Sequence, residues 1–107
     1  MITVIYYPEH CRLTMEGHSG ADEKGKDLIC AAATHNLYMF ASAVEMLCKQ
    51  KFAKKPDIQI EEGKADVSCR TKEGYKNICT FGLATVVAGF ALLASKYPEN
   101  IKFIEKN

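Results

Sequence analysis

The feature that most constrains the fold is a stretch of nineteen residues without a charge, from Asn77 to Ser95. Its length is close to the roughly 20 apolar residues that a membrane-spanning helix needs. We nevertheless expect a buried helix rather than a span, because the strand-like segment 101–104 that follows needs a soluble sheet as its partner. Small and polar residues also dilute the hydropathy of the stretch: Asn77, Thr80, Gly82, Thr85, Ala88 and Gly89.

This helix, predicted from about Tyr75 to Tyr97, has two different faces. One is narrow and would permit close packing: Ile78, Gly82, Thr85 and Gly89. The opposite face is apolar, with Leu83, Val87 and Phe90, and a helix lying on a single sheet would leave it in water. We therefore expect the apolar face to be covered by a dimer interface or by the other helix.

The remaining elements follow from the spacing of apolar residues. Segments 2–7 and 11–16 alternate around Pro8-Glu9-His10, and segments 57–61 and 65–69 alternate around 62–64, which predicts two β-hairpins. In the second hairpin Ile58, Ile60, Val67 and Cys69 would face one layer. Between the hairpins, helical spacing predicts a helix from Asp27 to about Lys51 or Phe52, before a break at Lys55-Pro56. Its apolar stripe is Ile29, Ala33, Leu37, Phe40, Val44 and Leu47.

The resulting order, ββαββαβ, predicts an α+β fold with a mostly antiparallel sheet and two helices packed on it. The length of 107 residues is typical of one domain, so we assign 1–107 to a single domain. The formal net charge of +1 gives no overall signature of nucleic-acid or anionic-membrane binding, and we expect neither as a direct partner.

The cysteines and histidines limit the chemistry. The five cysteines are widely spaced, with no Cys-x-x-Cys pair and no secretory signal, which indicates a reducing, cytoplasmic environment. His10, His18 and His35 fall in different local structures, so we expect no metal site and no cofactor.

A polar, glycine-rich loop from Gly17 to Lys26 joins the first hairpin to the first helix. His18 stands where the strand meets this loop. With Asp27 as the N-cap, Cys30 would lie in the first helical turn, where the helix dipole stabilises a thiolate and free backbone N–H groups can hold an oxyanion. An imidazole that titrates near neutral pH could act as the base. The residues taken singly also fit a buried thiol and a solvated loop histidine.

The combined, spaced set of Gly17-His18, Gly25, Asp27 and Cys30 resembles the signature of the ribosomal-processing cysteine proteases, the Prp or YsxB-like family. The Tyr97-Pro98-Glu99-Asn100-Ile101 ending is similar as well, and the resemblance covers the whole chain. The family usually has serine where this chain has Thr34, which keeps a hydroxyl but changes its χ1 preferences.

The resemblance implies a small, cytosolic, dimeric bacterial endopeptidase. Such proteins remove the short N-terminal extension of large-subunit ribosomal protein twenty-seven, cutting after an aromatic pair and before Ala. By position, Cys30 would be the nucleophile, His18 the general base and acid, and Asp27 an assisting residue, with Thr34 in the place of the family's serine. The loop would close over the peptide through Gly17, Ser19, Gly20, Asp22 and Gly25.

An alternative from another class is a non-catalytic ribosome-associated peptide-binding or assembly factor. In that case the loop would grip a peptide and Cys30 would be only a well-placed core thiol.

Overall fold

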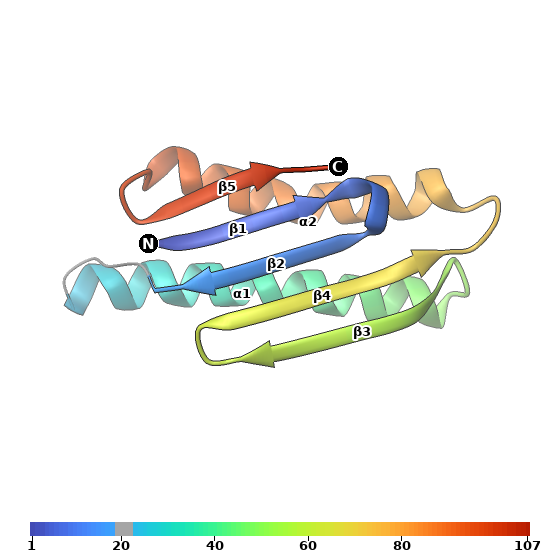
Figure 1. Cartoon of the computed structure of the whole chain (residues 1–107), viewed down its shortest axis with the longest axis horizontal. Coiled ribbons are helices and arrows are strands. Elements are labelled where there is room, and N and C mark those ends of the chain that lie inside the picture. The colour runs from blue at the N-terminus through green and yellow to red at the C-terminus, as the bar shows by residue number, and fades with distance from the viewer. Residues whose placement is uncertain (19–22) are drawn as a thin grey trace.

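The computed structural model describes residues 1–18 and 23–107, of which 23–27 are described by their backbone alone. The elements follow the predicted order (Figure 1). They are β1 (Ile2–Tyr7), a short 3-10 turn η1 (Pro8–His10), β2 (Arg12–Gly17), α1 (Glu23–Lys49), β3 (Ala53–Glu61), β4 (Lys64–Thr71), α2 (Lys76–Lys96) and β5 (Ile101–Glu105).

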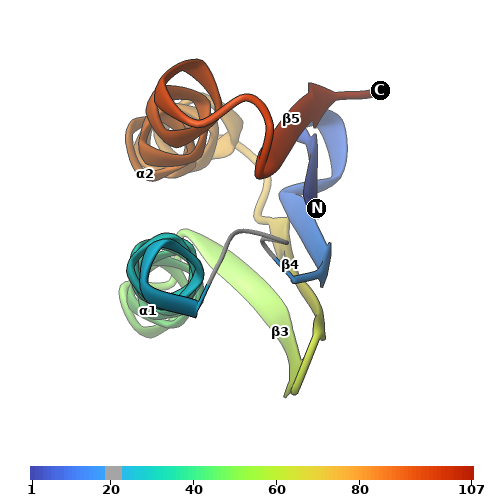
Figure 2. The same ribbon diagram turned by 90° about the vertical axis from the view of Figure 1, so that its left-hand side faces the viewer.

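The strands form one five-stranded sheet in the order β3-β4-β2-β1-β5. The β1/β2, β2/β4 and β3/β4 pairs are antiparallel, and β5 lies parallel to β1. Both helices lie on the same face of this sheet, α1 over β3 and β4 and α2 beside β5 (Figure 2). The predicted α+β fold with a mostly antiparallel sheet is thus confirmed.

The core fills the space between the sheet and the helices. Along β1, alternate side chains are buried, as a strand with one covered face requires. The most buried large side chains come from every layer: Val4, Tyr6, Leu13, Val67, Leu37, Phe40, Val44, Leu83, Phe90 and Ile101. The Tyr6 and Phe40 rings meet edge to face, with their centroids 6.1 Å apart.

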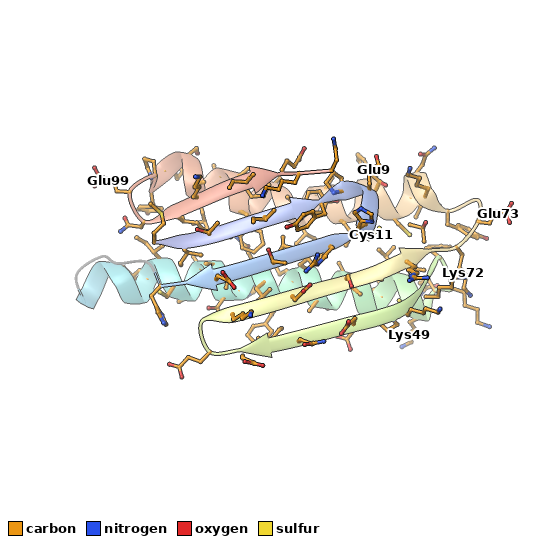
Figure 3. All side chains as sticks on the ribbon, viewed as in Figure 1. Glu9, Cys11, Lys49, Lys72, Glu73 and Glu99 are labelled. Atoms are coloured by element: carbon orange, nitrogen blue, oxygen red, sulfur yellow. The ribbon has the colours of Figure 1, made fainter. Side chains whose placement is uncertain are left out.

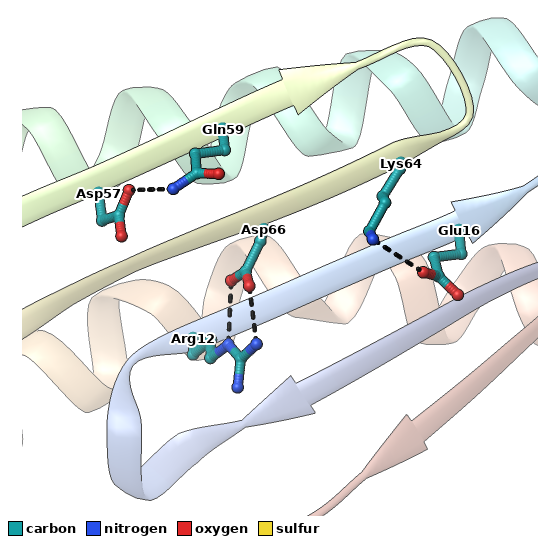
Figure 4. Close-up of polar contacts among 6 residues, drawn as sticks. All are labelled: Arg12, Glu16, Asp57, Gln59, Lys64 and Asp66. Atoms are coloured by element: carbon teal, nitrogen blue, oxygen red, sulfur yellow. Dashed lines mark hydrogen bonds and ion pairs between the residues drawn. The ribbon is translucent and has the colours of Figure 1, made fainter.

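The open face of the sheet carries a charge pair that joins β2 to β4 (Figure 4). Arg12 donates two hydrogen bonds to the Asp66 carboxylate, at 2.9 and 2.7 Å. These bonds hold the pKa of Asp66 below its usual value. The pair supports the registration of two strands that are far apart in the sequence.

The apolar face of α2 is covered within the chain, as predicted, and the opposite face is the more open one. Leu83, Val87 and Phe90 are at most 3% exposed and belong to the core between the helices and the sheet, whereas Ile78 on the other face is 48% exposed. Gly89 instead lies against Asn36 of α1. The physical reason is area, since burying Leu, Val and Phe removes more apolar surface from water than burying glycine.

By length and composition α2 could also cross a membrane: its most apolar window has a mean hydropathy of 2.0 and is 22% buried. One such helix is weak evidence for a membrane span, because the core helix of a soluble protein and a signal sequence meet the same criterion. Leu83, Val87 and Phe90, on one side of α2, are buried in the core of the chain.

Strand β3 lies at the edge of the sheet and differs from the prediction in two ways. The Lys55-Pro56 pair does not mark the end of α1 but lies inside β3, where Lys55 has a φ of 51° and the register shifts between Lys54 and Asp57. A proline has no N–H to offer a neighbour, so an edge strand with a bulge accommodates it. Ile58 is 36% exposed, because an edge strand is covered less completely than a central one.

Candidate active site

A cavity of about 380 Å³ opens between α1, the end of β2 and the β3–β4 turn. Three of the residues predicted to carry the chemistry line it: His18, Cys30 and Thr34. The structure therefore brings the strand end and the helix together in one cavity. Residues 60–65, from the β3–β4 hairpin, form another part of its wall.

Gly17 places His18 at the cavity. It is the last residue of β2, has a φ of +98°, and its N–H donates a 2.9 Å hydrogen bond to the Gly63 carbonyl. A Cβ at this position would overlap the carbonyl oxygen of Met1, so a side chain cannot be accommodated there. The glycine before the histidine thus lets the strand end pass close to the N-terminus. His18 itself is exposed.

Cys30 does not lie where the sequence analysis placed it within the helix. Helix α1 begins at Glu23, so Cys30 is its eighth residue and Asp27 is its fifth. The predictions of Asp27 as the N-cap and of Cys30 in the first turn are therefore wrong. Glutamate and lysine are good helix formers, and they carry the helix back through Gly25.

This position changes the electrostatics expected for the thiol. The field of a helix dipole falls off within its first turn, and the N–H of an eighth residue is bonded inside the helix. The helix start therefore provides Cys30 with neither a strong field nor a free N–H for an oxyanion. Nucleophilic chemistry at this position would therefore depend chiefly on a neighbouring base.

The residues that α1 contributes to the cavity wall form one stripe along the helix. Cys30 is partly buried, Thr34 lies one turn further along, and Leu37 and Tyr38 follow after another turn. Asp27 stands one turn before Cys30 on the same helix, and its side chain lies outside the described part of the structure.

The other predicted loop residues are less fully described. Ser19, Gly20 and Asp22 lie outside the described residues. Gly25, which we placed in the loop, is part of α1.

The cavity combines apolar and charged lining. Its apolar side chains are Ile2, Met15, Leu37, Ile60 and Ala65. Glu61, Glu62 and Lys64 add charges at the β3–β4 turn, and Lys64 pairs with Glu16 of β2 at 3.9 Å (Figure 4). Such a lining suits a peptide that places apolar side chains inside and its backbone at the rim.

The other four cysteines lie away from this cavity. Cys11 follows η1, at the end of the sheet opposite the β3–β4 turn (Figure 3). It is 4% exposed and shares a hydrogen bond with the Cys69 thiol, which lowers the pKa of Cys11 and raises that of Cys69. Burial raises the pKa of both Cys48 and Cys79. Buried thiols of this kind behave as small apolar side chains.

Within residues 1–18 and 23–107, no group of three or more histidine, cysteine or acidic side chains is arranged to hold a metal ion.

Sequence reasoning missed the contribution of the β3–β4 hairpin to this site. Glu62-Gly63-Lys64 is a predicted turn, but its contact with the strand end before His18 depends on the pairing of β2 with β4. No local pattern in the sequence carries that information.

The sequence model of the family described as cysteine protease Prp matches residues 1–102. No curated protein matches the chain.

Solved structures show the same fold. The essential ribosomal processing protease Prp from S. aureus, in complex with a covalently linked product peptide, is 24% identical, with a TM-score of 0.72 over 99% of this chain and 100% of that one. Its complex with a substrate peptide gives 23% identity and a TM-score of 0.72 over the same shares. The protein SMU.848 from Streptococcus mutans is 22% identical, with a TM-score of 0.68 over 97% of this chain and 90% of that one.

The matched range, residues 1–102, spans nearly all of the fold described above. The chain therefore belongs to the cysteine protease Prp family.

Proposed function

We propose that this chain is an endopeptidase that removes the short N-terminal extension of bacterial large-subunit ribosomal protein twenty-seven. The observation that carries the proposal is that His18, Cys30 and Thr34 line one cavity of about 380 Å³. Family membership supports cysteine protease chemistry. The S. aureus ribosomal processing protease, which has the same fold, has been seen with substrate and product peptides.

In the proposed reaction, His18 takes the proton of the Cys30 thiol, and the thiolate attacks the scissile carbonyl carbon. A C–S bond forms and the carbonyl oxygen becomes an oxyanion. When this collapses, the C–N bond breaks and the His18 imidazolium gives its proton to the leaving amine. Water then attacks the thioester with His18 again as the base, which releases the extension with a new carboxylate and restores the thiol.

Asp27 is proposed to assist, and Thr34 to help hold thiol or substrate. Asp27 stands one helical turn before Cys30 in α1. Thr34 lines the cavity one turn after Cys30. Because Cys30 lies well inside the helix, this proposal assigns most of the thiol activation to His18 rather than to the helix dipole.

The apolar part of the cavity is proposed to receive the aromatic pair that precedes the cut. Its side chains Met15, Leu37 and Ile60 come from β2, α1 and β3, so the site is assembled from three elements. The glycine-rich segment after His18 is proposed to close over the peptide.

We also propose that the chain works as a homodimer in the cytoplasm. The outer surface of the two helices carries exposed apolar side chains: Met39, Met46, Ile78, Phe81 and Leu92. An apolar surface of this kind favours a second copy of the chain as its cover. All five cysteines are free thiols, which fits a reducing compartment.

The test is cleavage of a synthetic peptide that spans such an extension and its junction, followed by mass spectrometry. The wild-type chain is expected to give two products, with a single cut after the aromatic pair. Cys30→Ala and His18→Ala should each lower kcat/KM by at least about a thousandfold, because the nucleophile and its base act as one unit.

Cys48→Ala is the matched control, since Cys48 is a second partly buried thiol on the same helix. It should cleave as the wild type does. Cleavage that survives Cys30→Ala would overturn the proposal, and tight peptide binding without any cleavage would favour the non-catalytic binding factor.

A further inference from the structure

The turn between β3 and β4 meets the end of β2 just before His18. In the β2/β4 pairing, Glu16 lies opposite Lys64, and the ladder continues with the hydrogen bond from the Gly17 N–H to the Gly63 carbonyl, at 2.9 Å. The residue that precedes His18 is therefore tied to the turn by its backbone. Any movement of the turn would move the backbone that carries the imidazole.

The turn also touches the His18 side chain. A Cβ built on Gly63 would lie 3.4 Å from Nε2 and 3.7 Å from Cε1 of the His18 ring. These are ordinary van der Waals distances for a methyl group, so the His18 ring lies beside the position that a side chain at residue 63 would take. Anything longer than a methyl group would have to compete with the ring for this space.

The backbone conformation at Gly63 also favours glycine, because its φ is +77°. It is the second central residue of a two-residue connection between Glu61 and Lys64, which pair across the hairpin. A positive φ at this position is what a type II turn requires, and glycine adopts it without strain. The conformation of the turn and the space left for the ring thus depend on the same residue.

We infer that Gly63 is a positioning residue for His18. Its carbonyl fixes the strand end through Gly17, and its missing side chain leaves free the space beside the imidazole that a side chain longer than a methyl group would enter. The inference rests on the proposed role of His18 as the base, and it adds a residue 45 positions further along the chain to the site. Because general-base catalysis depends on placement, a ring displaced by about 1 Å can lose a large part of the rate.

The chain offers a matched control for testing this. Gly74, in the connection between β4 and α2, has a φ of +89°, and a Cβ there would meet nothing within 4 Å among the described residues. Alanine at 63 or 74 therefore meets the same backbone penalty, but only the first reaches His18. Asparagine tolerates a positive φ better than most residues, and its side chain is longer than that of alanine. Comparing the two substitutions therefore separates the effect of side-chain size from that of backbone strain.

The experiment compares Gly63→Ala and Gly63→Asn with Gly74→Ala and Gly74→Asn in two measurements. The first is kcat and KM for the extension peptide. The second is the NMR chemical shifts of the His18 ring protons, assigned with His18→Ala, while His10 and His35 serve as internal references. Thermal unfolding checks that all four variants are folded.

We expect Gly63→Asn to lower kcat/KM at least about tenfold relative to Gly74→Asn, mostly through kcat. Gly63→Ala should have a smaller effect in the same direction. The His18 ring signals should move in both Gly63 variants and stay unchanged in both Gly74 variants. Unchanged His18 signals in Gly63→Asn, or a kcat/KM within about twofold of Gly74→Asn, would overturn the inference.

The two measurements also separate this inference from the proposed function. If the wild-type chain cut no peptide, the protease proposal would fall, whereas the His18 signals would still decide whether Gly63 holds the ring.

Discussion

The five free thiols differ in how far water reaches them. Cys79 is fully buried, Cys11 and Cys69 are 4% and 3% exposed, and Cys30 lines the open cavity. Burial raises the pKa of Cys48 and of Cys79, which disfavours the reactive thiolate in both. Reactivity toward a thiol reagent should therefore be selective.

We expect a maleimide or iodoacetamide reagent to label Cys30 first at pH 7, with the label located by peptide mass spectrometry. His18→Ala should slow this reaction roughly tenfold, because a thiol without a base is only a few per cent thiolate near pH 7. His35→Ala is the control, since His35 is exposed on the same helix. Equal slow labelling of all five cysteines would contradict activation by His18.

Tyr6 places a polar hydroxyl group in the core. It is 2% exposed, and its hydroxyl has no hydrogen-bond partner among the residues that the structure describes. Burial is the main cause that raises the pKa of Tyr6 to about 12 from a usual value of 10.0. A buried hydroxyl without a partner costs about 1 to 3 kcal/mol relative to an apolar group of the same shape.

Tyr6→Phe should therefore raise the free energy of unfolding by about 1 kcal/mol, measured by urea denaturation at pH 7. Tyr7→Phe is the matched control, because Tyr7 is only partly buried on the open face of the sheet. A lower stability of Tyr6→Phe would show that the hydroxyl has a partner in solution.

The raised pKa of Tyr6 also predicts a pH dependence. Because the folded-state pKa is above the unfolded one, the unfolded chain loses its proton first as the pH rises. The wild-type chain should keep this contribution below pH 10 and lose roughly 2 to 3 kcal/mol between pH 10 and 12. In Tyr6→Phe this part of the loss should be absent from the same titration.

Among the elements, helix α1 ends without a glycine after its last turn, although glycine is common at that position. The Phe52 N–H donates to the Leu47 carbonyl and the Lys51 N–H to the Cys48 carbonyl, both at 3.0 Å, which is the hydrogen-bond pattern of a Schellman motif. Lys51 occupies the left-handed position of this motif, with a φ of 66°. A residue with a Cβ is strained there, whereas glycine is not.

Lys51→Gly should therefore stabilise the protein by about 0.5 to 1 kcal/mol, seen as a higher urea midpoint. Lys49→Gly is the comparison, because Lys49 is the last residue of α1 and glycine costs up to about 1 kcal/mol within a helix. If both substitutions were equally destabilising, strain at Lys51 would not be the reason.

At the scale of the whole molecule, the outer surface of the helix layer exposes large apolar side chains to water. Phe81 is 74% exposed and Leu92 is 56% exposed on α2, and Met46 is 59% exposed on the neighbouring α1. A monomer would keep this apolar surface in water, and pairing with a second copy would remove it.

Phe81→Glu is expected to shift the proposed dimer to monomers in light scattering after size exclusion, because pairing would bury a charge. The monomer should unfold with nearly unchanged free energy, since Phe81 contributes little to the core. Ile58→Glu, on the edge strand away from this surface, should remain dimeric. A dimer that persists in Phe81→Glu would place the interface elsewhere.

The sequence by itself determined the kinds of element and most of their bounds. Alternation in residues 2–7 and helical spacing in the two long segments reflect hydrogen bonds and side-chain contacts between near neighbours, which a local pattern records. It also supplied His18 and Cys30 of the proposed site, whose spacing resembles a family signature, and Thr34, where the family usually has serine.

Only the tertiary structure decided where these pieces meet. It showed that α1 begins at Glu23, so Cys30 lies beyond the first helical turn, and that Leu83, Val87 and Phe90 of α2 are buried in the core. It also placed Gly63 against His18, through the pairing of β2 with β4. The packing of α2 and the contact of Gly63 with His18 depend on residues distant in the chain, and the total buried surface chooses among the possible contacts, so no local pattern contains them.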